Sequence, residues 1–355
     1  MNRLKLQRFA MNETFNEYSG RLYPRMYKPS RILIDLTYDC NLRCRNCDIW
    51  KLKKILKNID HTELSAEELK GLILYFKKWL GTSFITLSGG EPMLRKDIFE
   101  LINCASGTGI TNLITNGTLL DRDDFEILNT NLDMLTISLD GITPKTHDYL
   151  RGKKGTYNKI MSNIEQISEI SHNKKIKIAT VLMGYNSCEI VDLIKWAKSN
   201  YFGILFQQLS PNFGRINEDE LWYEKNKFWP DDCNEMSELI DEIISMKKRY
   251  PIQNSTKHLL LMKEYFRNPR TTSINCSIWK NFKILANGRV LYCPRYDIIG
   301  NMKKQNPRDV WFSEKGIRQR RLIKNCKSGC AILNCNYDYD LKDKISIFLA
   351  LLKSR

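Results

Sequence analysis

The stretch RILIDLTYDCNLRCRNC, residues 31–47, decides the fold. Its first part, residues 31–37, predicts a strand rich in apolar residues. Cys40, Cys44 and Cys47 follow directly, on a loop after that strand. Chemistry in α/β proteins collects at the carboxyl ends of the strands, so this stretch predicts both an element of a sheet and a thiol-rich site.

Downstream of this stretch, strand-like and helix-like segments alternate. The predicted strands are residues 31–37, 84–88, 111–115, 134–139, 176–182 and 202–207. Helices are predicted over 65–79, which opens with a capping signal, and over 157–170. This order indicates repeated β-α units with a parallel sheet, and periodicity alone leaves a doubly wound sheet and a partial barrel both open.

The regular alternation stops after residue 209. Residues 210–232 are predicted to be a connecting or substrate-side loop, and the aromatic residues in 222–229 either cover the active site or belong to the core. A helix is predicted over 234–248, and KILANGRVLYC, residues 283–293, predicts a hairpin around Asn287-Gly288. We expect Cys104 and Cys188 to be buried structural thiols.

Composition narrows the class of protein. The chain has 355 residues, 42% of them hydrophobic, with no signal peptide and no apolar run of the ~20 residues that span a bilayer. Eleven cysteines in a chain expected in the reducing cytoplasm favour metal or redox chemistry over disulfides. The net charge of +16 suits anionic partners, but the basic residues are spread along the chain, so we favour general surface charge over nucleic-acid binding.

The first cysteine cluster lacks a fourth ligand nearby. A structural zinc site would require one. A four-iron, four-sulfur cluster held by only three cysteines leaves one iron open to a small-molecule chelate. The spacing of Cys40, Cys44 and Cys47 therefore favours an iron-sulfur cluster whose last ligand is a substrate or cosubstrate.

The CxxxCxxC motif together with Ser88-Gly89-Gly90-Glu91-Pro92 after the second strand resembles the radical S-adenosylmethionine (radical SAM) enzymes. The resemblance covers roughly residues 31–209. It implies a partial (β/α)6 TIM-like barrel, a [4Fe-4S] cluster that binds S-adenosylmethionine, and its reductive cleavage to a 5′-deoxyadenosyl radical that abstracts hydrogen. The two glycines let the backbone approach a ligand without obstruction by a Cβ atom, and the Glu91 carboxylate suits an ammonium group.

Further elements of this family follow later strands. The resemblance implies that Asn116, Ser138, Asp140 and Arg151 line the cosubstrate, with Arg151 as a clamp for its carboxylate. The chain departs from the family at Asn46, where a bulky residue near adenine is common, and Trp50 is a candidate substitute.

A second group of cysteines lies near the C-terminus. It comprises Cys276, Cys293, Cys326, Cys330 and Cys335. Its spacing resembles the auxiliary-cluster extensions called SPASM and twitch, and implies one auxiliary [4Fe-4S] cluster held by Cys276, Cys293 and two of the last three. Zinc bound by four thiolates is the alternative.

These features divide the chain and assign it a role. The predicted units are an N-terminal extension (1–30), a radical SAM core (31–209), a linker and helical segment (210–275), an auxiliary-cluster domain (276–340) and a C-terminal helix (341–355). The predicted activity is oxidation or maturation of a peptide side chain or a small anionic or sugar metabolite. The alternatives are an RNA-modifying radical SAM enzyme and a non-catalytic zinc-stabilised binding protein.

The predicted partners follow from that activity. We expect an electron donor such as flavodoxin or ferredoxin, and a peptide or small-molecule substrate. We expect no nucleic acid. The apolar, lysine-flanked C-terminal helix is compatible with a peripheral membrane contact, although we favour its packing onto protein.

Overall fold

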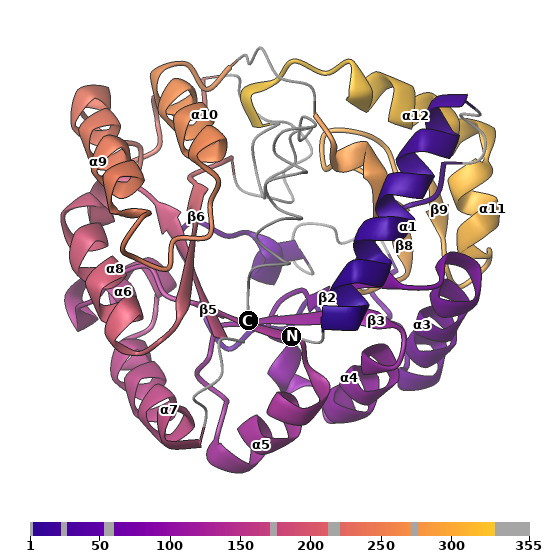
Figure 1. Ribbon diagram of the computed structural model, residues 1–355, viewed down its shortest axis with the longest axis horizontal. Helices are drawn as coiled ribbons and strands as arrows, with labels where there is room; N and C mark the ends of the chain where they lie inside the picture. The colour runs from indigo at the N-terminus through magenta and orange to yellow at the C-terminus, as the bar shows by residue number, and fades with distance from the viewer. Residues whose placement is uncertain are drawn as a thin grey trace.

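The computed structural model describes residues 3–22, 27–52, 60–170, 176–211, 221–270 and 276–330 (Figure 1). Within these residues the strands form one sheet in the order β6-β5-β4-β3-β2-β1-β7-β8-β9. The first six in the chain are β1 (Arg31–Asp35), β2 (Ser83–Ser88), β3 (Gly109–Thr115), β4 (Met134–Ser138), β5 (Ile176–Leu182) and β6 (Gly203–Gln208). Neighbours among these six pair in parallel, so the predicted partial (β/α)6 barrel is confirmed.

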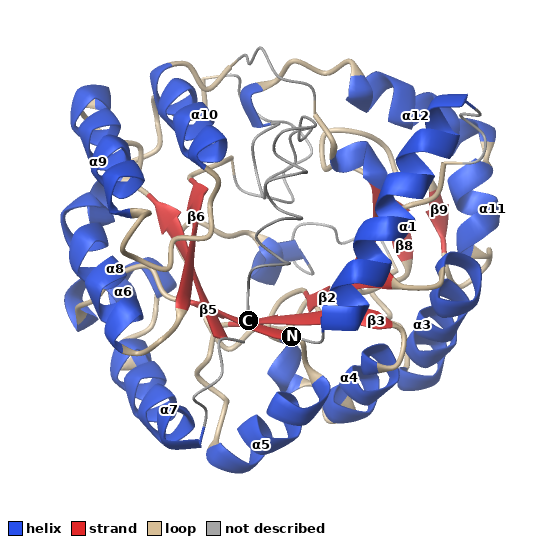
Figure 2. Cartoon of the chain, viewed as in Figure 1, coloured by secondary structure: helices blue, strands red, loops and turns tan. Residues whose placement is uncertain are grey.

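Helices cover the outside of this curved sheet (Figure 2). They are α3 (Ala66–Leu80), α4 (Ile98–Ser106), α5 (Arg122–Asn131), α6 (Pro144–Arg151), α7 (Thr156–Ile170), α8 (Ile190–Ser199), α9 (Cys233–Met246) and α10 (Thr256–Arg267). The short 3-10 helices are η2 (Ile49–Lys51), η3 (Pro92–Leu94), η4 (Gly184–Glu189) and η5 (Ile278–Lys280). The predicted helices at 65–79, 157–170 and 234–248 correspond to α3, α7 and α9.

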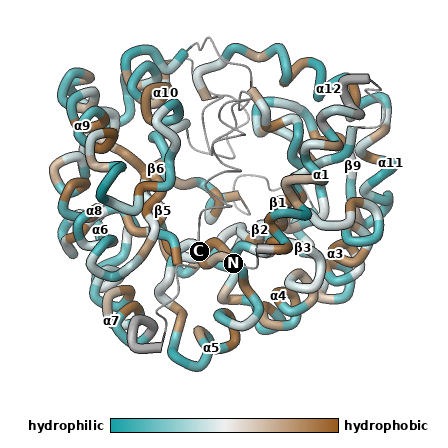
Figure 3. The backbone as a smooth tube through the Cα atoms, in the orientation of Figure 1, coloured by the Kyte–Doolittle hydropathy of each residue, from teal (hydrophilic) through white to brown (hydrophobic). Residues whose placement is uncertain are grey.

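Sequence alternation decides which strand face meets the helices. In β1, Ile32 and Ile34 are fully buried in the same core cluster as Phe76 of α3, while the residues between them are half-buried. β5 and β6 alternate in the same way. Burial of each such aliphatic side chain stabilises the fold by roughly 1.5–3 kcal/mol. Figure 3 shows the resulting hydrophobic segments along the strands and hydrophilic segments on much of the outer helices.

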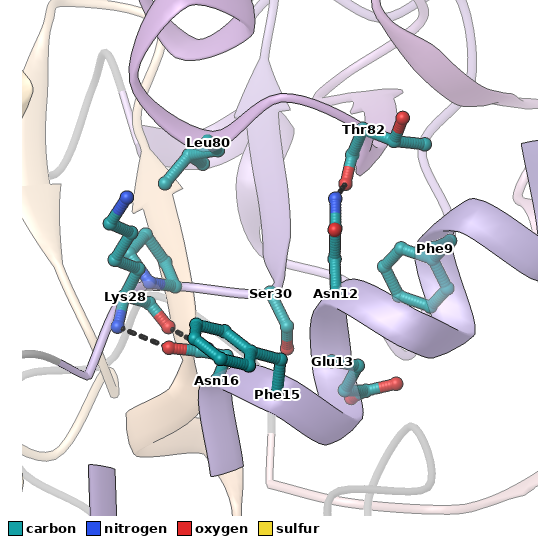
Figure 4. Close-up of a pocket in the computed structure, with 10 residues that line it drawn as sticks. Phe9, Asn12, Glu13, Phe15, Asn16, Lys28, Ser30, Leu80 and Thr82 are labelled. Atoms are coloured by element: carbon teal, nitrogen blue, oxygen red, sulfur yellow. Dashed lines mark hydrogen bonds between the residues drawn. The ribbon is translucent and has the colours of Figure 1, made fainter. Parts of the chain in front are cut away.

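Helix α1 (Arg3–Leu22) lies against the amino ends of the strands. Lys5 Nζ forms an ion pair with Asp133, just before β4, at 3.0 Å, and Asn12 Nδ2 donates to the Thr82 carbonyl, just before β2, at 3.3 Å. A cavity of about 200 Å³ lies beside this helix, between Phe9, Asn16 and Leu80 (Figure 4). Both α1 and this cavity therefore lie at the end of the strands opposite to the cysteine loop.

The C-terminal part continues the barrel sheet. Strand β7 (Asn281–Ile284) pairs in parallel with β1, and β8 (Arg289–Leu291) and β9 (Gly300–Asn301) follow antiparallel. The predicted hairpin is confirmed as β7 and β8, with Gly288 at φ +83° in its turn. Helices α11 (Pro307–Phe312) and α12 (Glu314–Lys324) complete this part.

Three sequence predictions about single segments have different outcomes. Phe228 is buried with Leu150, Met183 and Leu209, as the core interpretation of the aromatic loop predicts. Cys104 is only half-buried, and Cys188 is exposed, so the prediction of two buried thiols is wrong. In η4 it is Asn186 that points inward and donates to the Asp140 and Val181 carbonyls, which leaves Cys188 outside.

Two predictions lie outside the described residues: the C-terminal helix at 341–355 and the ligand Cys335. Across the parts of the chain that the structure does describe, none of the helices combines the length and the apolar character needed to cross a bilayer.

Candidate active site

The three cysteines of the first cluster lie together after β1. Cys44 is buried, and Cys40 and Cys47 are half-buried. Burial raises the pKa of Cys47 to about 12, with a contribution from the neighbouring thiols Cys44 and Cys40, which disfavour a further negative charge. Burial also raises the pKa of Cys40. Cys40 and Cys47 therefore need a cationic partner before they ionise readily.

The donor set fits an iron-sulfur cluster in its chemistry. Thiolates are the usual ligands of such clusters, and binding iron removes the need for thiol protons. Within the described ranges, no three His, Cys, Asp or Glu side chains form a ready-made site for a single metal ion. The fit lies in the identity of the three donors and in their position on one loop.

The glycine loop after β2 packs directly on the cysteine loop. Gly90 N–H donates to the Thr37 carbonyl and Glu91 N–H to the Asp39 carbonyl, both at 2.7 Å. A Cβ on Gly89, which has φ +125°, would lie 2.6 Å from the Thr37 oxygen, and a Cβ on Gly90 would clash with the Asp39 oxygen. The two glycines thus permit the approach of one loop to another, an approach that the sequence interpretation assigned to a ligand.

Glu91 joins this loop to the end of β3. Its fully buried carboxylate accepts hydrogen bonds from Thr115 Oγ1 at 2.7 Å, Asn116 N–H at 2.7 Å and Met93 N–H at 3.1 Å. Burial nevertheless raises the pKa of Glu91. A carboxylate has about four lone-pair sites, so these three bonds leave room for one further donor, such as an ammonium group.

Asn116 connects the same edge back to the cysteines. Its Nδ2 donates to Asn41 Oδ1 at 2.8 Å, and Asn41 Nδ2 donates to Thr118 Oγ1 at 2.9 Å. Asn41 and Thr118 were not predicted from sequence. Asn41 lies at a position between Cys40 and Cys44 where the motif specifies no residue type, so no sequence signal marks it.

Asp140 and Arg151 form a buried ion pair at this edge. Arg151 Nη2 lies 2.8 Å from Asp140 Oδ2, and Arg151 Nη1 lies 3.9 Å from the Cys44 sulfur. Although burial lowers the pKa of Arg151, Asp140 and Cys44 outweigh it and raise that pKa overall. The buried Arg151 Nε has no hydrogen-bond partner among the described residues, so the guanidinium retains a donor for an anionic ligand.

The remaining predicted residues lie around this group. Ser88 and Ser138 end β2 and β4, both half-buried, and buried Pro92 begins η3. The candidate adenine residue Trp50 donates from Nε1 to the Cys44 carbonyl at 3.3 Å. The structure therefore brings the predicted core residues to one edge of the sheet, at the carboxyl ends of the strands.

Two side chains that were not predicted from the sequence accept hydrogen bonds from the segment that begins at Asp140. Glu189 accepts from Ile142 N–H at 2.7 Å and from the hydroxyl groups of Thr143 and Thr146. Fully buried His147 accepts at Nδ1 from Asp140 N–H at 3.2 Å. His147 lies four residues before the predicted ligand Arg151, but no sequence signal indicated its role.

The second cysteine group is also gathered by the fold. Cys276 is buried, and Cys293, Cys326 and Cys330 are half-buried. Burial, with a smaller contribution from the thiols of Cys326 and Cys330, raises the pKa values of Cys276 and Cys293 to about 12. Four thiols from three segments thus influence one another electrostatically, and thiolates are the ligands that an iron-sulfur cluster requires.

Comparison with known proteins identifies the core. Residues 34–197 match a family model described as the radical SAM superfamily. This chain carries a radical SAM domain. A domain of this kind, together with relatives named as a synthase and cyclases, indicates that the chain is an enzyme.

Named relatives extend the likeness beyond this domain. The AdoMet-dependent heme synthase of Methanosarcina barkeri (strain Fusaro / DSM 804) is 26% identical over 321 residues, covering 87% of this chain and 89% of the synthase. The PqqA peptide cyclase of Rhizobium meliloti (strain 1021) is 36% identical over 146 residues, covering 41% of this chain and 38% of the cyclase. The chain thus spans less than half of the cyclase's length.

Among solved structures, Streptococcus suis SuiB bound to precursor peptide SuiA superposes with a TM-score of 0.65 at 16% identity. The match covers 92% of this chain and 75% of SuiB. It shows that the two chains share a fold that includes the C-terminal part.

Proposed function

We propose that the chain binds a [4Fe-4S] cluster through Cys40, Cys44 and Cys47 and uses it to cleave S-adenosylmethionine reductively. When bound, the cluster would supply the single electron that breaks the sulfonium bond and yields methionine and a 5′-deoxyadenosyl radical, which takes a hydrogen atom from the substrate. The observation that carries this proposal is the convergence of three thiols, the Gly89-Gly90 loop and the Asp140–Arg151 pair at one edge of a radical SAM domain.

The chain's own residues would orient the cosubstrate. Arg151, whose Nε has no partner within the described part of the chain, would hold the carboxylate, and Glu91, through its remaining lone pair, would hold the ammonium group. Ser138, Asp140 and Asn116 would complete the contacts to the carboxylate and ribose. Buried Asp140 would keep Arg151 charged and fixed in direction.

The test is anaerobic reconstitution with iron and sulfide, followed by S-adenosylmethionine and dithionite. We expect 5′-deoxyadenosine to form. An intact first cluster without that product would contradict the proposed reaction.

We further propose that Cys276, Cys293, Cys326 and Cys330 hold an auxiliary [4Fe-4S] cluster that transfers electrons. The proximity of these four thiols supports it. The parent should bind about eight irons, and Cys293→Ala about four, since each cubane holds four. Stoichiometric zinc in the parent, without the second set of sulfides, would assign this group to a structural zinc site instead.

For the substrate, we propose a peptide side chain or a small anionic metabolite. SuiB was solved with a precursor peptide and the PqqA cyclase is named for one, which supports a peptide. The heme synthase matches over most of both chains, which supports a small molecule. A peptide library and a set of carboxylate-bearing metabolites, added separately, would decide between them by which one raises 5′-deoxyadenosine above background.

The reaction needs a reductant inside the cell. We propose flavodoxin or ferredoxin as the donor and the cytoplasm as the compartment, because free thiols of this number require a reducing environment.

A further inference from the structure

Exposed cations surround the loop that carries the first cysteines. Arg43 and Arg45 lie within that loop, Lys153 and Lys154 follow α6, and Lys227 lies in the segment after β6, all of them exposed. We refer to these five residues as the cationic rim. None of them belongs to the residues proposed above to bind the cluster or S-adenosylmethionine.

Backbone contacts hold two parts of the rim side by side. Arg43 N–H donates to the Arg151 carbonyl at 3.2 Å, and Arg45 N–H to the Leu150 carbonyl at 2.8 Å. Gly152, at φ +68°, ends α6 so close to Arg43 that a Cβ there would clash with the Arg43 carbonyl oxygen. Lys153 and Lys154 therefore emerge directly beside the cysteine loop.

Tyr149 contacts two cations of the rim, Arg45 and Lys227. The Arg45 guanidinium lies 4.4 Å from its ring centroid and donates from Nε to its carbonyl at 2.9 Å. Lys227 Nζ donates to the Tyr149 hydroxyl at 3.1 Å. Tyr185 stacks on the same ring with centroids 4.7 Å apart. These contacts order Arg45 and Lys227 before any partner arrives.

Acidic side chains close to the rim compensate little of this charge. Asp48 is buried and forms an ion pair with Lys51, and the Asp148 carboxylate accepts from the backbone N–H groups of Gly155 and Tyr157. Two acids near the rim are exposed: Glu224, in the segment of Lys227, and Asp39, directly before Cys40. The rim therefore presents excess positive charge over thiols that are themselves buried or half-buried.

We propose that the cationic rim is the docking surface for a small acidic one-electron carrier protein that reduces the first cluster. The inference rests on the proposed function, which requires one electron from outside the chain. In the transfer the carrier is oxidised by one electron and the cluster reduced by one, and no bond forms or breaks. Opposite charge favours this partner because it accelerates association and orients the carrier over the cysteine loop.

The test compares two double charge reversals. Lys153→Glu with Lys154→Glu changes the rim, and Lys248→Glu with Arg249→Glu is the matched control. The control residues are exposed and follow α9 next to the amino end of β6, at the opposite edge of the sheet. Each protein is reconstituted and assayed for 5′-deoxyadenosine with dithionite and with an acidic flavodoxin.

With dithionite, all three proteins should be equally active, because a small reductant needs no docking surface. With flavodoxin, kcat/KM for the carrier should fall on the order of tenfold in the rim variant only. The Kd of oxidised flavodoxin, measured by titration calorimetry, should rise similarly in that variant. The difference from the parent should shrink between about 0.01 M and 0.15 M salt, as the Debye length falls from ~30 to ~8 Å.

Several outcomes would overturn the inference. Equal flavodoxin kinetics and binding in both variants would place the carrier elsewhere, and an equal loss with dithionite would assign the rim to the cosubstrate or substrate. Binding of a single-stranded RNA oligonucleotide that only the rim variant loses, with flavodoxin unaffected, would assign the rim to nucleic acid. No 5′-deoxyadenosine from the parent with dithionite would instead refute the proposed function, and the inference with it.

Discussion

The buried ion pair of Asp140 and Arg151 joins three segments of the barrel near the carboxyl ends of the strands. Asp140 Oδ1 also accepts from Val181 N–H at 3.0 Å, so the carboxylate links the segment after β4 to β5 and to α6. His147 contributes by accepting the Asp140 N–H at Nδ1. An imidazolium could not accept that bond, because both of its ring nitrogens carry protons.

His147 predicts a pH dependence of stability. Burial holds its pKa well below 6.5, so below that pH the unfolded chain takes up a proton that the folded chain does not. The contribution of His147 to the free energy of unfolding is therefore complete above pH 6.5. As the pH falls below 6.5, the free energy of unfolding should decrease by up to about 1.4 kcal/mol per pH unit. Urea unfolding between pH 7 and pH 5 measures this slope.

His147→Asn is the matched variant, because its side-chain oxygen can accept the Asp140 N–H without titrating. It should show a shallower slope than the parent, whatever its stability at pH 7. An equal slope in both proteins would show that His147 is not held neutral.

Glu91 gives a second prediction at this scale. In the parent protein both oxygens of the Glu91 carboxylate accept hydrogen bonds, from Thr115, Asn116 and Met93. In Glu91→Gln an NH2 group replaces one of these oxygens and therefore faces at least one of the three donors. We expect a loss of about 1–3 kcal/mol in the free energy of unfolding. Glu224→Gln, at an exposed position, is the control and should change it by less than about 0.5 kcal/mol. A loss no larger in Glu91→Gln than in the control would refute the buried network.

At the scale of elements, local signals predicted the barrel well. The strand predictions agree with β1 to β6 to within two residues at their ends, because alternation and β-branched runs act locally. The position of β7 beside β1 was not predictable in the same way, since it joins segments about 250 residues apart. For the same reason the contacts of Glu91 with Thr115 and Asn116 became visible only in the folded chain.

The capping box of α3 makes a prediction for this element. Ser65 Oγ accepts from Glu68 N–H at 3.2 Å, and the Glu68 carboxylate accepts from Ser65 N–H at 2.8 Å. Ser65→Ala should lower the free energy of unfolding by about 1 kcal/mol. Ser245→Ala in α9, where the exposed hydroxyl only donates to Glu242 O, should change it by less than about 0.5 kcal/mol. Equal effects in urea unfolding would show that the cap is not formed.

In the whole molecule, the two ends of the barrel differ. Helix α1 lies over the amino ends of the strands, and the candidate site lies at their carboxyl ends. The C-terminal part shares the sheet through β7, and Lys283 of β7 forms an ion pair with Asp35 of β1 at 3.2 Å. The domain boundaries at 210 and 276 remain a prediction, and the shared sheet indicates that the parts they separate unfold together.

Trp311 tests this cooperativity. It is fully buried in α11 and donates from Nε1 to the Tyr27 carbonyl at 2.7 Å, ahead of β1. Trp311→Ala should cost about 3–5 kcal/mol and shift a single unfolding transition. The exposed Leu322→Ala in α12 is the control. Two separate transitions by circular dichroism and fluorescence, with only one shifted, would show that the C-terminal part folds independently.

The most direct test of the central claim replaces Cys40, Cys44 and Cys47 together by alanine and measures iron and 5′-deoxyadenosine after anaerobic reconstitution. Cys188→Ala, at an exposed cysteine outside both groups, is the control. We predict about eight irons and product formation in the parent and the control, and about four irons with no product in the triple variant. Product from the triple variant, or none from a parent whose first cluster is intact, would contradict the account.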